Sequence, residues 1–113
     1  MIAKPVPRVV ERAEKRRLRQ RMQRDVYWLV TARDGRKCRA CAASADPAAL
    51  DSLKRGHHHH VRFRSRGGDN STVNLVLLCA LCHSAVHVTR ELTITGNADS
   101  TLTMARDGRI WHG

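Results

Sequence analysis

Four cysteines in two close pairs constrain this chain more than any other feature of its sequence. Two residues separate Cys38 from Cys41, Cys79 and Cys82 repeat that spacing, and 37 residues lie between the pairs. Each pair can place two thiolates at one tetrahedral metal ion, so the two pairs together predict a structural zinc site. Two disulfides or unrelated buried thiols are the alternatives, and a reducing compartment disfavours the disulfides.

A chain of 113 residues with four aromatic side chains can bury only a modest core. This size allows one domain with an appendage and excludes a multidomain enzyme. Zinc would supply the missing stability, since structural sites contribute about 10–16 kcal/mol in small domains. The longest apolar run, Leu75–Cys82, is too short to span a membrane, and the N-terminus lacks the apolar segment of a secretion signal. We therefore expect a cytoplasmic protein.

The net charge of +11 indicates a polyanionic partner, above all nucleic acid. Residues 1–24 hold nine basic and two acidic residues, so most of the surplus lies there. The arginines of this segment that we expect to contact DNA are Arg12, Arg16, Arg17 and Arg19. A solvated helix face, or a surface that docks a protein partner, would have the same composition.

The N-terminal third is expected to be a mobile tail over residues 1–7 and a helix over residues 8–33. Its half from Asp25 onward should pack on the domain, while the arginine-rich half projects. The apolar stripe of this helix consists of Leu18, Met22, Val26, Leu29 and Val30.

The rest of the chain alternates short helices with strands. Residues 47–55 should form a helix capped by Asp46, with Leu50 and Leu53 facing inward. We expect a strand over residues 57–64, a buried apolar segment over 75–78 and a helix over 80–89. Apolar residues alternating with polar ones over 92–110 predict a C-terminal β-meander.

Six of the seven histidines fall into two clusters, one over residues 57–60 and the other formed by His83 and His87. His83 and His87 are four residues apart on the expected helix, so both rings share a face and can bind one metal ion. Alternatively, Cys79, Cys82 and these two histidines could bind a single zinc. That arrangement lacks the twelve-residue gap of a zinc finger and leaves the run of four histidines unexplained.

The order of these residues resembles the HNH endonuclease family, in particular the members with four zinc-binding cysteines and a ββα-metal core, common in bacteria and phages. The resemblance covers residues 38–87, in which five separated elements occur in order. The matching segments are Cys38-x2-Cys41, His59-His60-Val61-Arg62-Phe63-Arg64-Ser65-Arg66-Gly67-Gly68 and Asn74-Leu75-Val76-Leu77-Leu78-Cys79-x2-Cys82-His83-x3-His87.

The resemblance implies a role for each matched residue. His60 would be the general base that deprotonates the attacking water, and Asn74 would hold the loop and orient that base. His59, His83 and His87 would bind a catalytic divalent cation, whether Mg2+, Mn2+, Ni2+ or Zn2+. The four cysteines would hold a structural zinc with no part in the reaction. Products would carry 5′-phosphate and 3′-hydroxyl ends.

The run of four histidines leaves the register of the active pair open. His59 with His60 places Val61 and the two following glycines where the family pattern expects them, and a shift to His58 with His59 is the alternative. Strict strand alternation would send His59 and His60 to opposite faces, so either the strand ends or distorts there or one role is wrong. His57 and His58 are expected to be exposed.

These observations predict an α+β protein with a small zinc-stapled ββα-metal core. A basic tail and helix would occupy residues 1–34, the HNH core residues 35–90 and the β-meander residues 91–113. We expect a monomer or weak dimer that nicks double-stranded DNA with little sequence preference. Alternating along their strand, Arg62, Arg64 and Arg66 would follow the phosphate backbone, unless they form only a solvated face. The rival hypothesis is a catalytically inactive, zinc-stabilised nucleic-acid-binding module.

Overall fold

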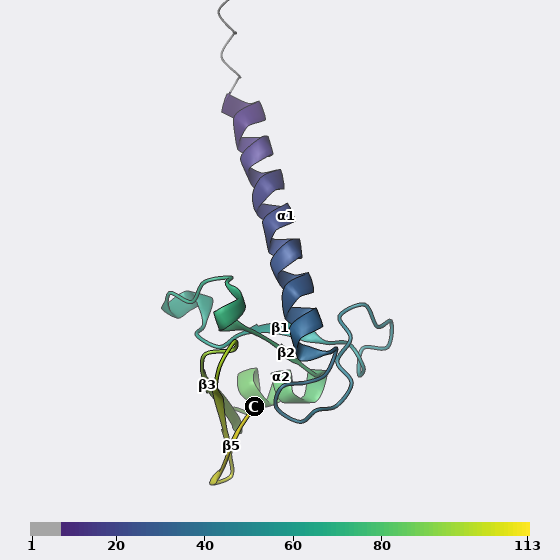
Figure 1. Ribbon diagram of the computed structural model, residues 1–113, viewed down its shortest axis with the longest axis vertical. Helices are drawn as coiled ribbons and strands as arrows, with labels where there is room; N and C mark the ends of the chain where they lie inside the picture. The colour runs from purple at the N-terminus through teal and green to yellow at the C-terminus, as the bar shows by residue number, and fades with distance from the viewer. Residues whose placement is uncertain (1–7) are drawn as a thin grey trace, which may run out of the picture.

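The computed structural model describes residues 8–113, which combine a long N-terminal helix, a ββα core and a three-stranded β-meander (Figure 1). Residues 1–7, expected to be a mobile tail, lie outside the described part. The structure confirms the α+β class. Within residues 8–113, no helix has both the length and the hydrophobicity that crossing a membrane requires.

Helix α1 (Arg8–Asp34) is 27 residues long, or about 40 Å, and most of it projects away from the rest of the protein (Figure 1). Only part of the expected apolar stripe is buried. Val30 is fully buried, but Leu29 is 60% exposed, and Leu18 and Met22 are also exposed. Only the last turns of the helix therefore have tertiary contacts that stabilise them.

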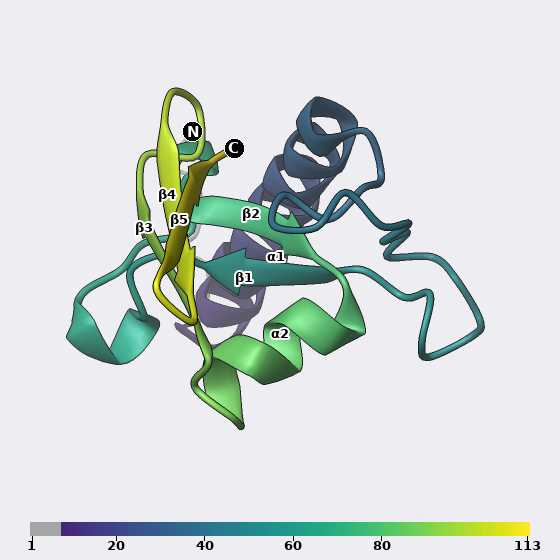
Figure 2. The ribbon, with the colours of Figure 1, turned by 90° about the horizontal axis from the view of Figure 1, so that it is seen from below.

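Strands β1 (His57–His60) and β2 (Leu75–Leu78) form an antiparallel pair, and helix α2 (Ala80–His87) follows β2 directly. The four residues of β2 are fully buried because α1 approaches the pair from one side and α2 from the other (Figures 1 and 2). The expected buried segment at residues 75–78 is confirmed. The expected helix over residues 80–89 forms and ends at His87.

The expected β-meander is also confirmed. Strands β3 (Leu92–Gly96), β4 (Leu102–Arg106) and β5 (Arg109–His112) pair antiparallel in the order β3-β4-β5. Alternate side chains of β3 and β4 are buried against the core, as the period of two requires. These buried residues are Leu92, Ile94, Leu102 and Met104.

A buried carboxylate joins α1 to the core. The Asp34 side chain is fully buried and accepts hydrogen bonds from the Arg33 Nε (2.8 Å), from an Arg39 guanidinium nitrogen (2.8 Å) and from the backbone amide of Leu77 in β2 (2.9 Å). Arg39 also donates to the backbone carbonyl of Gly113 (2.9 Å). The end of α1, the first cysteine loop, β2 and the C-terminus therefore meet at one carboxylate.

The helix expected over residues 47–55 does not form. Asp46 accepts a hydrogen bond from the Ala48 amide (2.9 Å), as a helix cap would, but Asp51 makes the same local bond to the Leu53 amide (2.9 Å) and begins a second turn. Such Asp-based turns compete with helical hydrogen bonds. Leu50 and Leu53, expected to face inward, are exposed.

The strand expected over residues 57–64 ends at His60, and Arg64–Arg66 form a short 3-10 turn, η1. The expectation that Arg62, Arg64 and Arg66 alternate along one strand face is therefore wrong. The Arg62 Nε instead donates to the backbone carbonyl of Arg66 (2.8 Å), which folds the segment back on itself. The three arginines are exposed on a loop.

Candidate metal centres

The four cysteine sulfurs form one cluster in which all lie within 4.8 Å of one another. Cys38 and Cys41 sit on a tight turn in which the Ala42 amide donates to the Cys38 carbonyl and the Cys38 amide donates to the Ala43 carbonyl, each at 2.8 Å. Cys79 caps the N-terminus of α2, where its sulfur accepts from the Cys82 amide at 3.4 Å. Two local turns therefore present two thiols each, as the spacing predicted.

This donor set fits a structural zinc ion. Tetrahedral Zn–S bonds of ~2.3 Å place sulfur atoms ~3.8 Å apart, and the Cys41 and Cys79 sulfurs are 3.6 Å apart. Burial and the neighbouring Cys38 sulfur raise the pKa of the Cys82 thiol well above its usual range, so adjacent thiolates need a cation to coexist. None of the four cysteines forms a disulfide.

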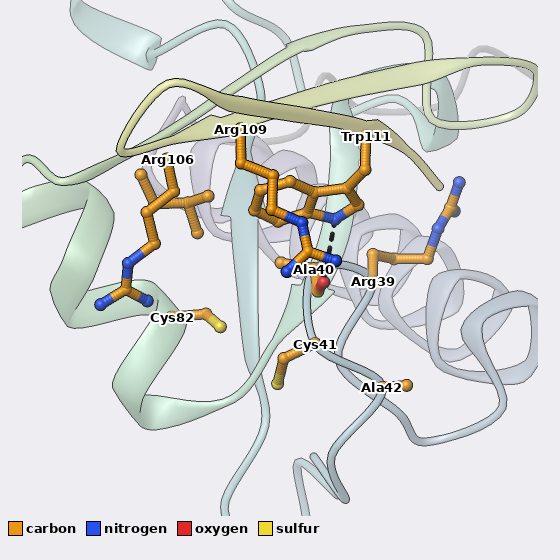
Figure 3. A pocket seen from close by; sticks show the side chains of 9 residues that line it. Arg39, Ala40, Cys41, Ala42, Cys82, Arg106, Arg109 and Trp111 are labelled. Carbon is orange, nitrogen blue, oxygen red and sulfur yellow. Dashed lines mark hydrogen bonds between the residues drawn. The ribbon is translucent and has the colours of Figure 1, made fainter.

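The C-terminal meander covers the outer side of the cysteine cluster (Figure 3). There a hollow of about 520 Å³ is lined by Cys41, Cys82, Arg109 and Trp111 among others. The Trp111 indole N–H donates to the backbone carbonyl of Ala40 (3.1 Å), which ties β5 to the first cysteine turn. The Arg109 guanidinium lies over the indole ring, 5.6 Å from its centre.

A second cluster is formed by ring nitrogens of His59, His83 and His87, which also lie within 4.8 Å of one another. The His59 Nδ1 and His87 Nε2 atoms are 3.2 Å apart. His59 is buried at the end of β1, His83 is half-buried and His87 is exposed on the adjoining face of α2. The cluster is therefore open to solvent on one side.

The electrostatics of the histidine cluster favour neutral rings. Burial, together with the neighbouring imidazoles, lowers the pKa of His59 to about 3 and that of His83 to about 4. Near pH 7 both rings are therefore unprotonated and can donate a lone pair to a metal ion. Three protein ligands with an open side are typical of catalytic metal sites, in contrast to the closed four-ligand arrangement of structural ones.

The other two histidines of the run are not exposed, contrary to expectation. The His58 ring stacks on Tyr27 of α1 with 4.3 Å between ring centres, and its Nε2 donates to the Tyr27 carbonyl (3.1 Å). The His57 ring stacks on His83 with 4.8 Å between centres. Both are half-buried because helices α1 and α2 lie on either side of β1.

His60 lies outside the three-histidine cluster, and its Nε2–H donates to the Asn70 side-chain oxygen at 2.6 Å. This bond leaves Nδ1 as the ring nitrogen with the lone pair. His60 nevertheless lines the same hollow of about 390 Å³ as His59, His83 and His87. Sequence reasoning missed Asn70, because a polar residue in a loop carries no local signal of such a contact.

Asn74 acts on the loop between His60 and Asn70. Its side-chain oxygen accepts from the Arg62 amide (2.7 Å), and its side-chain nitrogen donates to the carbonyls of Arg62 (3.1 Å) and Asp69 (2.8 Å). The loop can close this tightly because residue 68 is glycine, where a Cβ would lie 1.7 Å from the Arg62 carbonyl oxygen. Asn74 thereby holds Asp69, the residue that precedes Asn70.

The arginines expected to contact DNA occupy two separate places. Arg12, Arg16, Arg17 and Arg19 are exposed on the projecting part of α1. Arg64 lines the wall of the histidine hollow, and Arg62 and Arg66 line a neighbouring groove that shares His59 and His87 with it. The structure therefore separates a remote basic surface from one beside the histidines.

Residues 38–89 match the model of the HNH endonuclease family. The ββα core, the four-cysteine cluster and the three-histidine cluster all lie within the matched segment, and the clustered cysteines fit the zinc-binding, four-cysteine type of this family. No significant match was found among curated proteins or among solved structures. Helix α1 and all three strands of the meander lie outside the matched residues.

Proposed function

We propose that the protein is a metal-dependent endonuclease that hydrolyses phosphodiester bonds of double-stranded DNA. One observation carries the proposal: three imidazoles that can share a cation line the same solvent-open hollow as His60, which lies outside their cluster. Phosphodiester hydrolysis needs these two functions, charge neutralisation and proton abstraction, next to each other.

His59, His83 and His87 would hold the catalytic divalent cation, for which Mg2+, Mn2+, Ni2+ and Zn2+ are candidates. When bound, the cation would act as a Lewis acid that neutralises charge on the phosphate and the leaving oxygen. The cysteine cluster would hold a separate structural zinc. Because its donor set has no open position, that zinc would take no part in the reaction.

His60 would be the general base. Its Nε2–H is bonded to Asn70, so its Nδ1 lone pair can accept a proton from a water molecule in the hollow. The resulting hydroxide would attack phosphorus in line with the 3′ oxygen, which leaves as the phosphorus–oxygen bond breaks and takes a proton from a solvent water. Products would then carry 5′-phosphate and 3′-hydroxyl ends.

Asn74 and Asn70 would be positioning residues for this base. Asn74 fixes both ends of the intervening loop, and Asn70 orients the ring of His60 through its side chain. The contacts of His58 support His59 and His60 as the active pair. His58 donates a hydrogen bond to the Tyr27 carbonyl and stacks on the Tyr27 ring, so its role would be to hold α1 against β1.

The charge distribution supports an enzyme that binds DNA through the DNA backbone, and the cytoplasm remains the compartment we propose for it. The seven arginines expected to contact DNA would bind phosphates rather than bases, which predicts low sequence preference. They are Arg12, Arg16, Arg17, Arg19, Arg62, Arg64 and Arg66. A single hollow would cut one strand, so we expect nicking by a monomer or weak dimer.

A plasmid-nicking assay with Mg2+, Mn2+ or Ni2+ tests the proposal. We expect conversion of supercoiled to relaxed plasmid, abolished by EDTA and reduced roughly 10²–10⁴-fold by His60→Ala. Cleavage that survives both treatments would contradict the mechanism. Binding without cleavage in all three metals would instead support an inactive nucleic-acid-binding module.

A further inference from the structure

A groove of about 680 Å³ adjoins the histidine cluster. It shares His59 and His87 with the histidine hollow but does not include His60. One wall is the loop after β1, which contributes Arg62 and Arg66. The other wall lies outside the segment that matches the family and consists of Arg90 and strand β3.

The groove is basic, with an apolar floor that includes Val61, Phe63 and Val86. Its lining within the described residues contains three arginines and no carboxylate. The ion pairs formed among residues 8–113 do not involve Arg66 or Arg90. Arg90 is held at the corner between α2 and β3 with a φ of 57°, an unusual conformation for a non-glycine residue.

Strand β3 adds hydrogen-bonding groups to this wall. It is an outer strand of its sheet, since only β4 pairs with it among the described elements. Ile94 and Leu92 face the core, so Thr93 and Thr95 are exposed. Hydroxyl groups and backbone amides of this kind are common partners of phosphate and sugar oxygens.

We propose that this groove binds the sugar–phosphate backbone of the strand being cut, on the 5′ side of the scissile phosphate, through Arg66 and Arg90. The inference rests on the proposed endonuclease function. Arg90 and strand β3, which complete this binding surface, both lie outside the segment that matches the family.

The position of His60 sets the direction of the strand. In an in-line displacement the leaving 3′ oxygen lies opposite the attacking water, and that water must lie next to the general base. The leaving oxygen therefore points away from His60. Of the two hollows that share His59 and His87, the groove is the one that His60 does not line, so we place the leaving oxygen on the groove side. The nucleotides attached through that oxygen are those on the 5′ side.

Binding of a short fluorescein-labelled DNA duplex in EDTA tests the groove independently of cleavage. The test variant is Arg66→Ala with Arg90→Asn, since asparagine tolerates a positive φ. The matched control is Arg36→Asn with Arg109→Ala, which removes the same charge away from the groove. Arg36 matches Arg90 because both have a positive φ, and Arg109 matches Arg66 because both are exposed.

We expect the test variant to bind roughly tenfold more weakly, with a salt-dependence slope lower by about two, because two phosphate contacts are lost. The control should retain wild-type nicking and most of its binding. Equal affinities for the two double variants, with equal melting temperatures, would overturn the proposal even if the wild-type protein nicks DNA. Absence of nicking with this binding difference intact would count against the endonuclease instead.

Cut positions on a 3′-labelled duplex test the direction. The wild-type protein should spare the bonds nearest the 5′ end of the labelled strand, because a cut there leaves the groove empty. The Arg66→Ala/Arg90→Asn variant should lose this bias. Equal cutting near both ends by the wild-type protein would overturn the assigned direction.

Discussion

The cysteine and histidine clusters both draw on helix α2, yet their surroundings differ. Cys79 and Cys82 stand at its N-terminal turn, next to His83 and one turn before His87. Three of the four cysteines are buried, and the meander covers that cluster. The histidine cluster has three donors and a solvent-open side.

In the proposed function, one short helix would serve stability and chemistry together. A closed set of four sulfurs leaves no position for a water or substrate, so its metal can only hold the chain. An open set of three nitrogens leaves positions free and contributes less to the fold. Variants in the two clusters should therefore fail in different ways.

The largest expected effect is the loss of the fold in Cys82→Ser. Structural zinc contributes about 10–16 kcal/mol, more than the total stability of most small domains. We expect no bound zinc by metal analysis and no cooperative transition in circular dichroism. If Cys82→Ser melts like the wild-type protein, the cysteine cluster does not hold the fold, and the two clusters do not differ in this way.

His83→Ala changes the residue that follows Cys82 on the same helix, and this variant should keep its fold. We expect one zinc per chain to remain after EDTA treatment, while nicking falls by roughly a hundredfold or more. Nicking rate and zinc content, measured on the same preparation, check this. Loss of the tightly held zinc would show that the two clusters are not independent.

Asp34→Ala tests whether the cysteine cluster alone holds the fold. Removing one partner from a buried charge network costs about 3–5 kcal/mol, because Arg33 and Arg39 would lose their shared carboxylate. Urea denaturation of the zinc-bound protein measures this free energy of unfolding. Asp99→Ala is the control, since this more exposed partner of Arg33 should cost less than about 1 kcal/mol.

Asn70→Ala should affect catalysis without affecting either cluster. With the hydrogen bond to His60 gone, we expect the nicking rate to fall about tenfold, while zinc content stays unchanged. Asn70→Asp, which keeps an acceptor for the His60 N–H, should restore part of the rate. Equal rates for both variants would mean that Asn70 does not orient the base.

The smallest effect is expected for His58→Ala. Loss of the stacking and hydrogen bonding with Tyr27 should cost about 1–2 kcal/mol of stability. Nicking should be unaffected, because His58 is not one of the active pair in the proposed register. A large loss of activity with normal stability would instead favour His58 and His59 as that pair.

Features that depend on local spacing could be predicted from the sequence. The two cysteine turns, the shared helix face of His83 and His87, and the alternating strands of the meander each follow from residues a few positions apart. The helix expected at residues 47–55 failed because two Asp side chains satisfied nearby amides in separate turns. Local patterns do not show which of two local hydrogen-bond arrangements will be adopted.

By itself, the sequence predicted the two donor sets: two pairs of cysteines for a closed site, and His83 and His87 with the histidine run for an open one. Only the tertiary structure decided that β1 ends at His60, that Asn70 meets this ring, that Asp34 anchors α1 and that β3 completes a groove beside His87. The physical reason is distance along the chain. Contacts between residues 10 to 43 positions apart depend on how separate elements pack, and packing is a property of the whole fold.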